Sequence, residues 1–198
     1  MKALSLAIIG LVGATFVQSA GGQDRPSAQE LATRTVGLLV RGEFQPVAES
    51  MHYPPSYTPA QRQKDVTTTA AGLDLTEREF GEISDTKPHT GSAEFYEVGG
   101  SGGSVAYLAS LKPYYSGQFL YDAKFSKLGD GYVRIAVIQL TADAGFEVLG
   151  VYFGLQATPH SKATLADITR RQLIHMNVPI TPDLERQIDA LKPIQYPS

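Results

Sequence analysis

The feature that most constrains this chain is a change in the spacing of its apolar residues, from a helical period to a period of two. Between residues 118 and 126 apolar and polar residues alternate. The apolar side consists of Phe119, Tyr121, Ala123 and Phe125. Alternation of this kind is typical of a β-strand with one buried face, so another layer of the fold must cover that face.

Two further strands are expected after this one. The turn-forming sequence Gly129-Asp130-Gly131 predicts a hairpin, and residues 132–140 and 146–155 form the next strands, separated by a turn at 141–145. Twelve of the 18 aromatic residues fall between residues 95 and 155, as strands favour. The sequence therefore predicts a three-strand antiparallel meander.

The register of the meander is predicted from charge and from apolar pairing. A two-residue loop at the first hairpin would place Lys127 opposite Arg134, a pair of like charges. We therefore expect a three-residue loop with Gly131 left-handed, which pairs Phe125 with Ile135 and Ala123 with Val137. In the second hairpin the expected pairs are Val133 with Phe153, Ile135 with Val151, and Val137 with Leu149.

Along the chain, helices are expected both before and after the strands. Ser27 and Glu30 form a capping box that opens a helix running to residue 41, with Gly42 as its stop. A short helix over 44–51 follows. A third helix opens at Thr58-Pro59 and is expected to end near Gly72. In the tail we expect helices over 163–175 and 181–191.

These elements define an α+β fold, in which N-terminal helices pack on a curved antiparallel β-meander and a helical C-terminal tail follows. The expected domain spans residues 27–155, and the C-terminal extension spans residues 158–198.

The first 20 residues have the layout of a secretory signal peptide. Lys2 precedes an apolar run from Ala3 to Val17, and small residues follow it. We therefore expect an exported protein, periplasmic or extracellular, with no stable membrane anchor after cleavage. The chain has no Cys, so its stability must come from its core instead of disulfides.

Charge narrows the range of partners. The net charge is -3 and the isoelectric point is near 5.8. Nucleic-acid binding requires a clustered positive field, so no nucleic-acid partner is expected. A small-molecule ligand, a protein partner, and a homodimer formed through the sheet remain open.

Two segments carry a resemblance to a known family. They are Leu38-Leu39-Val40-Arg41-Gly42-Glu43-Phe44-Gln45-Pro46-Val47 and Gly145-Phe146-Glu147-Val148-Leu149-Gly150. The first is similar to the helix entry, and the second to the final strand, of bacterial exported members of the nuclear transport factor 2-like (cystatin-like) superfamily. This resemblance implies a pocket between helices and sheet. Members include enzymes, binders and dimerisation modules, so the fold alone does not give the function.

The candidate binding residues lie on and around the strands. The sheet face opposite the apolar one carries Asp122, Lys124, Arg134 and Tyr152. Arg134 in a central strand needs a partner, which Asp122 or a ligand carboxylate could supply. The aromatic residues Tyr107 and Tyr121 could line a pocket for an apolar ligand. The alternatives are a solvated sheet face and ordinary packing of aromatic residues.

A possible nucleophile lies in Gly99-Gly100-Ser101-Gly102-Gly103, which matches the pattern of a nucleophile elbow. Asp143 with His160 or His175 would then complete a hydrolase triad. The alternative is a flexible glycine loop. The four histidines are scattered, with none in a metal-binding spacing, so each is expected on the surface or in a loop, and no metal or cofactor is expected.

The resulting hypothesis is an exported, non-catalytic domain that binds a small apolar or amphipathic ligand, or a protein partner, in a pocket between helices and sheet. The alternative is a small-molecule enzyme that uses Asp122 with a tyrosine as acid and base, or a Ser101 hydrolase.

Overall fold

The computed structural model describes residues 25–101 and 105–197, so the predicted signal peptide lies outside the described residues. The fold is α+β. The helices are α1 (Ala28–Val40), α2 (Phe44–Glu49), α3 (Pro59–Phe80), α4 (Val105–Ser110), α5 (Pro159–His175) and α6 (Pro182–Asp189). The strands are β1 (Ile83–Pro88), β2 (Ala93–Ser101), β3 (Tyr115–Phe125), β4 (Gly129–Gln139), β5 (Glu147–Gln156) and β6 (Ile194–Tyr196).

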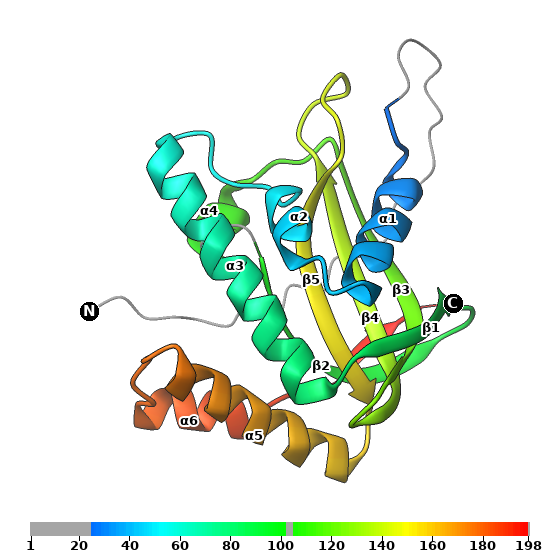
Figure 1. The fold of residues 1–198 in the computed structure, drawn as a ribbon, viewed down its shortest axis with the longest axis vertical. Helices are drawn as coiled ribbons and strands as arrows, with labels where there is room; N and C mark the ends of the chain where they lie inside the picture. The colour runs from blue at the N-terminus through cyan, green and yellow to red at the C-terminus, as the bar shows by residue number, and fades with distance from the viewer. Residues whose placement is uncertain (1–24, 102–104, 198) are drawn as a thin grey trace.

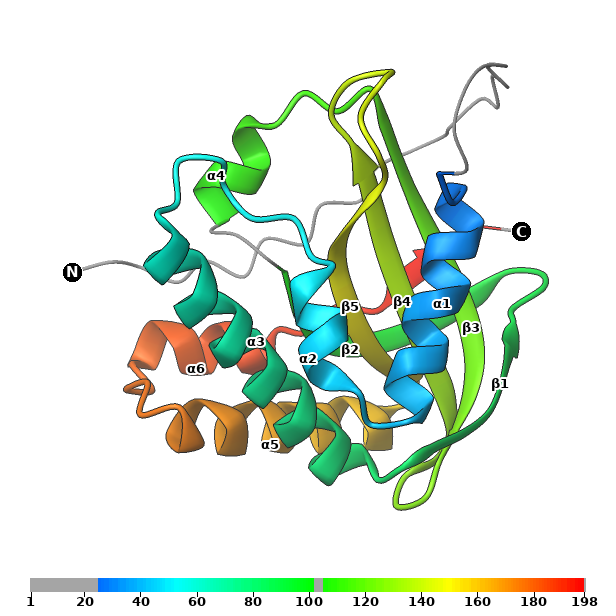
Figure 2. The same ribbon diagram turned by 45° about the horizontal axis from the view of Figure 1, so that its top comes forward.

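The named strands form one antiparallel sheet in the order β1-β3-β4-β5-β2-β6. Helices α1, α2 and α3 lie against one face of this sheet (Figures 1 and 2). The predicted arrangement of N-terminal helices on a β3-β4-β5 meander is therefore confirmed. Among the described residues, no helix combines the length and apolarity needed to cross a bilayer.

The N-terminal helices begin where the capping boxes predict, at Ser27 and Thr58. However, α3 continues through Gly72 to Phe80, so the predicted end at Gly72 is wrong. Leu73 and Phe80 are buried against the core, and this tertiary packing outweighs the helix penalty of one glycine, about 1 kcal/mol. The stop is Gly81, whose φ of 91° favours glycine.

The register of the first hairpin differs from the prediction. Phe125 pairs with Gly129, and Phe119 pairs with Ile135, because the turn uses residues 126–128 and the left-handed glycine is Gly129 instead of Gly131. The shift is an even number of residues. For this reason every side chain keeps its predicted face although its partner changes.

In the second hairpin, Val133 pairs with Phe153 and Ile135 with Val151, as predicted. The third predicted pair is wrong, because Val137 pairs with Val148 instead of Leu149. The register shifts between Ala136 and Val137, which indicates a β-bulge. This bulge turns Val148 into the core, where it is fully buried.

Three strands were not predicted in full. β1 and β6 each lie at an edge of the sheet, and β2 continues through the glycines that were interpreted as a loop. Gly99 pairs with Tyr152, and a Cβ at Gly99 would collide with the carbonyl of Val151. These glycines therefore allow a close backbone approach within the sheet.

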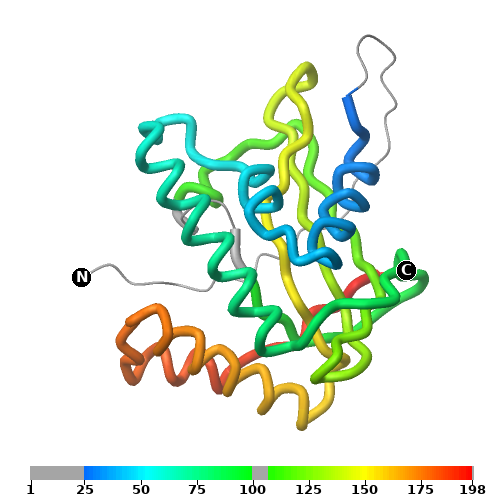
Figure 3. The backbone as a smooth tube through the Cα atoms, in the orientation of Figure 1, coloured from blue at the N-terminus to red at the C-terminus, as the bar shows by residue number. Residues whose placement is uncertain are grey.

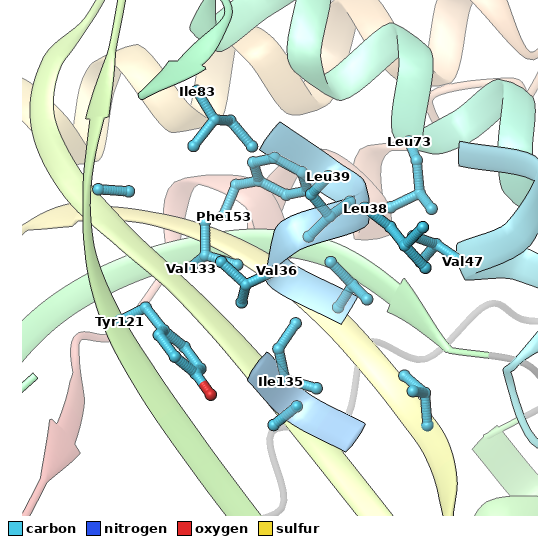
Figure 4. Packing of buried hydrophobic residues seen from close by; sticks show 14 of the residues in the cluster. Val36, Leu38, Leu39, Val47, Leu73, Ile83, Tyr121, Val133, Ile135 and Phe153 are labelled. Atoms are coloured by element: carbon cyan, nitrogen blue, oxygen red, sulfur yellow. The ribbon is translucent and has the colours of Figure 1, made fainter. Parts of the chain in front are cut away.

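The space between the helices and the sheet is occupied by packed side chains (Figure 4). Phe80 and Phe125 make an edge-to-face contact with ring centres 4.9 Å apart, and the ring of Phe153 lies 5.6 Å from Phe80. All three side chains are at most 1% exposed. Each buried Phe stabilises the fold by about 1.5–3 kcal/mol, so these positions serve the core.

The C-terminal extension packs on the same core as the rest of the chain. Helix α5 starts at Pro159, four residues before the sequence suggested, because Thr158 and Ser161 form a capping box. Its residues Leu165 and Ile168 join the central core. The last strand pairs with β2, and the end of the described chain lies near β1 (Figure 3), where the rings of Tyr196 and His89 are 6.4 Å apart.

Candidate functional site

The structure distributes the predicted binding residues among four environments. Tyr121 faces the helical layer, where its hydroxyl lies 3.0 Å from that of Thr33 in α1. The second sheet face carries the other residues predicted from the strands, but it divides them between a buried ion pair and an open cleft. Tyr107 lies elsewhere, in α4.

The buried ion pair joins Arg134 of β4 to Glu97 of β2. Nε of Arg134 donates to Glu97 at 2.8 Å, and Nη1 donates to the side-chain oxygen of Gln118 at 2.9 Å. The guanidinium also stacks on the ring of Tyr152, 3.9 Å from its centre. Burial alone would lower the pKa of Arg134, but the hydrogen bond and charge of Glu97 raise it overall. The partner of Arg134 is thus Glu97, and not Asp122 or a ligand carboxylate, the two partners considered from the sequence.

Asp122 instead belongs to a group that we name the His89 cluster, formed by Lys87, His89 and Asp122. Nδ1 of His89 lies 2.6 Å from a carboxylate oxygen of Asp122, and Nζ of Lys87 lies 3.7 Å from the other. Nε2 of His89 is buried and has no hydrogen-bond partner among the described residues. The ring of Tyr132 contacts the imidazole edge-to-face.

The backbone holds His89 in place. This residue follows β1, and its N–H donates to the carbonyl of Leu120 in β3 at 2.8 Å. This hydrogen bond continues the pairing of β1 with β3 beyond Pro88 and Tyr121. His89 lies in the loop after β1, within the expectation of a surface or loop position, but its side chain is only 13% exposed.

An open cleft of about 370 Å³ lies over the His89 cluster. It is lined by Asp85, Lys87, Asp122, Ala123, Lys124, Asp130, Gly131, Tyr132 and Gln156. Lys124 and Asp130 are cross-strand partners on β3 and β4, so the lining carries side chains of opposite charge next to each other. Burial, aided by the charge of Asp122, raises the pKa of Tyr132 and keeps its hydroxyl protonated.

A second imidazole–carboxylate pair was not predicted. We name it the His52 cluster, formed by His52, Tyr107 and Glu147. Nδ1 of His52 lies 2.6 Å from a carboxylate oxygen of Glu147, and Nε2 lies 2.7 Å from the Tyr107 hydroxyl. The side chain of His52 is 4% exposed, whereas that of Glu147 is 49% exposed. His52 lies outside the helices and strands, within the expectation of a surface or loop position, but its side chain is buried.

Local backbone pairing positions the His52 cluster. Met51 forms a bridge with Val148, and the N–H of His52 donates to the carbonyl of Val148 at 2.7 Å. This pairing fixes His52 beside Glu147 at the start of β5. Helix α4 then brings the Tyr107 ring parallel to the imidazole, with ring centres 5.7 Å apart.

The hydrogen bonds define proton positions in the His52 cluster. An ionised carboxylate can only accept, so Nδ1 of His52 carries the hydrogen that Glu147 receives. With a neutral imidazole, Nε2 accepts from the Tyr107 hydroxyl. Burial, aided by the charge of Glu147, raises the pKa of Tyr107, so the hydroxyl keeps its proton at neutral pH.

The two clusters lie at opposite ends of the sheet. Asp122 pairs with Tyr132 in β4, whereas Glu147 pairs with Ile138. Six residues of β4 separate these rows, or about 20 Å of strand. One molecule of ordinary ligand size cannot contact both clusters.

The Ser101 triad lacks its partners. Asp143 precedes β5 and His160 follows it, so the length of this strand, about 30 Å, separates them. His175 lies in α5, away from the turn that contains Asp143 (Figures 1 and 2). The side chain of Ser101 is not among the described ones, and the hydrolase interpretation based on Asp143 is wrong.

No family model matches the chain, and no match was found among curated proteins or solved structures. The site must therefore be interpreted from its own geometry. Within residues 25–101 and 105–197, no group of three or more His, Asp and Glu side chains converges as a metal site would require.

Proposed function

We propose that this chain is an exported protein that binds a small amphipathic molecule in the cleft over Asp122 and Tyr132. The single observation that carries this proposal is the cleft itself. Its volume falls in the range of small-molecule sites, about 300–1,000 Å³. The export component of the proposal rests on the apolar run in residues 1–20.

The lining of the cleft favours a ligand with both a positive and a negative group. Three carboxylates, those of Asp85, Asp122 and Asp130, offer acceptors for an ammonium group. Lys87 and Lys124 offer donors for an acidic group. The ring of Tyr132 provides an apolar surface between them. We therefore propose a small zwitterion with an apolar portion.

The support for this site includes the way Asp122 is held. Its bond to His89 fixes one carboxylate oxygen, and the 35% exposure of its side chain leaves the group accessible from the cleft. A binding group that is already oriented loses less conformational entropy when a ligand arrives. Arg134, by contrast, is held by Glu97, Gln118 and Tyr152, so we assign it to supporting the sheet instead of contacting the ligand.

We also propose membership of the nuclear transport factor 2-like superfamily, which the order of helices followed by an antiparallel meander supports. The proposed ligand site differs from the one that this resemblance implies. It lies on the sheet face away from α1, α2 and α3, because packed core residues fill the other side.

The test is native mass spectrometry of the mature protein purified from its export compartment, followed by small-molecule analysis after denaturation. We expect a zwitterionic compound bound to the wild type. The double variant Asp122→Asn/Asp130→Asn should lose it. The matched control Asp183→Asn changes an exposed carboxylate on α6 and should keep it. Ligand-free protein, or a compound retained equally by both variants, would overturn the proposal.

A further inference from the structure

The His52 cluster contains the order of groups that activates a hydroxyl for attack on an electrophile. A hydroxyl, an imidazole and a carboxylate are joined in series, by contacts of 2.7 Å and 2.6 Å. In this order the imidazole removes the hydroxyl proton, and the carboxylate orients the imidazole and stabilises its charged form. Here the hydroxyl belongs to Tyr107.

Burial of the imidazole supports a functional interpretation. A buried polar chain contributes little net stability relative to apolar packing, because each group must be desolvated. His52 is nevertheless enclosed, with both ring nitrogens engaged. Its two partners are more accessible, since Glu147 is exposed and Tyr107 is half-buried. The hydrogen bonds thus join a buried imidazole to two more accessible side chains.

The surroundings indicate the type of substrate. The Tyr107 ring, which lies parallel to the imidazole of His52, is the aromatic surface next to the hydroxyl. Aromatic surfaces favour apolar groups. The exposed carboxylate of Glu147 would repel an anionic substrate.

We propose that the His52 cluster is a second, catalytic site that hydrolyses small uncharged carboxylic esters through acylation of Tyr107. This activity goes beyond ligand binding in the cleft and takes place at the other end of the sheet. Tyr107 and His52 are its catalytic residues, and Glu147 is a positioning residue.

The reaction balances with water as the only co-reactant. The Tyr107 oxygen attacks the ester carbonyl carbon while His52 Nε2 takes the phenolic proton. The bond to the alcohol oxygen breaks, and the leaving alkoxide takes the proton from His52. Water then attacks the tyrosyl ester, with His52 accepting its proton. The carboxylic acid departs, and the proton returns to the Tyr107 oxygen.

The test follows nitrophenolate release from p-nitrophenyl acetate by the mature protein. We expect turnover above that of buffer with an equal concentration of free imidazole. Tyr107→Phe should lower kcat at least about 100-fold and abolish any initial burst. His52→Gln should show a loss of similar size. The matched control Tyr114→Phe removes a hydroxyl from an exposed tyrosine nearby and should retain the wild-type rate.

Glu147 is tested by a readout that a purely structural role would not change. Glu147→Gln should lower kcat about 10-fold or more with little change in KM, and Glu147→Asp should restore part of the loss. Circular dichroism and thermal melting identify any variant that fails to fold. Wild-type protein no faster than imidazole would overturn the proposal. A folded Tyr107→Phe variant with the wild-type rate would also overturn it.

Discussion

The His52 and His89 clusters contain the same pair of groups, an imidazole held 2.6 Å from a carboxylate. The two clusters differ in the surroundings of the second imidazole nitrogen. In the His52 cluster the second imidazole nitrogen bonds to the Tyr107 hydroxyl. In the His89 cluster that nitrogen is buried and has no described partner, and the accessible group is the Asp122 carboxylate at the cleft.

We infer that the group in contact with an imidazole–carboxylate pair determines what the pair can do. A pair that contacts a hydroxyl can accept the proton of that hydroxyl, which is the activating step of nucleophilic catalysis. A pair that presents a fixed carboxylate offers an oriented hydrogen-bond acceptor, so it is equipped for recognition. The predictions below test this contrast, from the largest expected effect to the smallest.

The largest effect should come from the buried pair Arg134–Glu97, which lies on strands between the two clusters and provides a structural reference. Glu97→Gln leaves a buried guanidinium without its counter-charge and should cost about 3–5 kcal/mol of unfolding free energy. Chemical denaturation measures this loss. A cost below about 1 kcal/mol would show that Glu97 does not stabilise the buried charge of Arg134. The pair could then no longer serve as a structural reference for the two clusters.

A smaller effect is expected from removing residues 194–198. Ile194 and Tyr196 pack on the cluster of Phe95 and Leu120, next to His89. Their loss should cost about 2 kcal/mol of stability and weaken binding in the cleft. Nitrophenolate release should be unchanged, because the His52 cluster lies at the other end of the sheet. Equal losses of both functions would contradict their separation.

Matched substitutions compare the two imidazoles directly. His52→Phe breaks two side-chain hydrogen bonds and should cost about 1–2 kcal/mol. His89→Phe breaks one, removes a buried nitrogen that has no described partner, and keeps a ring against Tyr132, so it should cost less than about 1 kcal/mol. Thermal melting of both variants provides the comparison, and a costlier His89→Phe would reverse our ranking.

The smallest effects concern tyrosine ionisation. Burial is the main cause that raises the pKa of both Tyr107 and Tyr132. A neighbouring carboxylate adds to it, Glu147 for Tyr107 and Asp122 for Tyr132. A raised pKa means that folding favours the protonated phenol. This stabilisation is present below the ordinary value of about 10 and is lost as pH rises through the folded-state pKa.

NMR titration of tyrosines labelled at Cζ can resolve the two groups. Glu147→Gln should lower the pKa of Tyr107 alone, and Asp122→Asn should lower that of Tyr132 alone. A shift of both pKa values in either variant would mean that the clusters are electrostatically coupled, in conflict with their separation along β4.

The sequence was sufficient for features that depend on neighbouring residues. The capping box of Ser27 predicted the start of α1, and alternation along β3 predicted which side chains face the core. Register was harder to predict, since one left-handed glycine, Gly129, and one bulge after Ala136 changed the pairing without changing the apolar pattern of β3.

The His52 cluster was beyond prediction for a physical reason. Its members are separated by 55 and 40 positions along the chain, and only the pairing of Met51 with Val148 brings His52 to β5. No local pattern encodes that pairing. Arg134 illustrates the intermediate case, because its need for a partner was evident, but the choice of Glu97 depended on the pairing of β2 with β5, which no local pattern encodes.

The central claim is that the hydroxyl of the His52 cluster takes part in chemistry. Its most direct test is brief exposure of the wild type to p-nitrophenyl acetate, acid quenching, and peptide mapping by mass spectrometry. We predict an acetyl group on the Tyr107 oxygen, which is absent when His52 is replaced by Gln. Acetylation confined to lysine side chains and the amino terminus, at equal levels in both proteins, would contradict the claim.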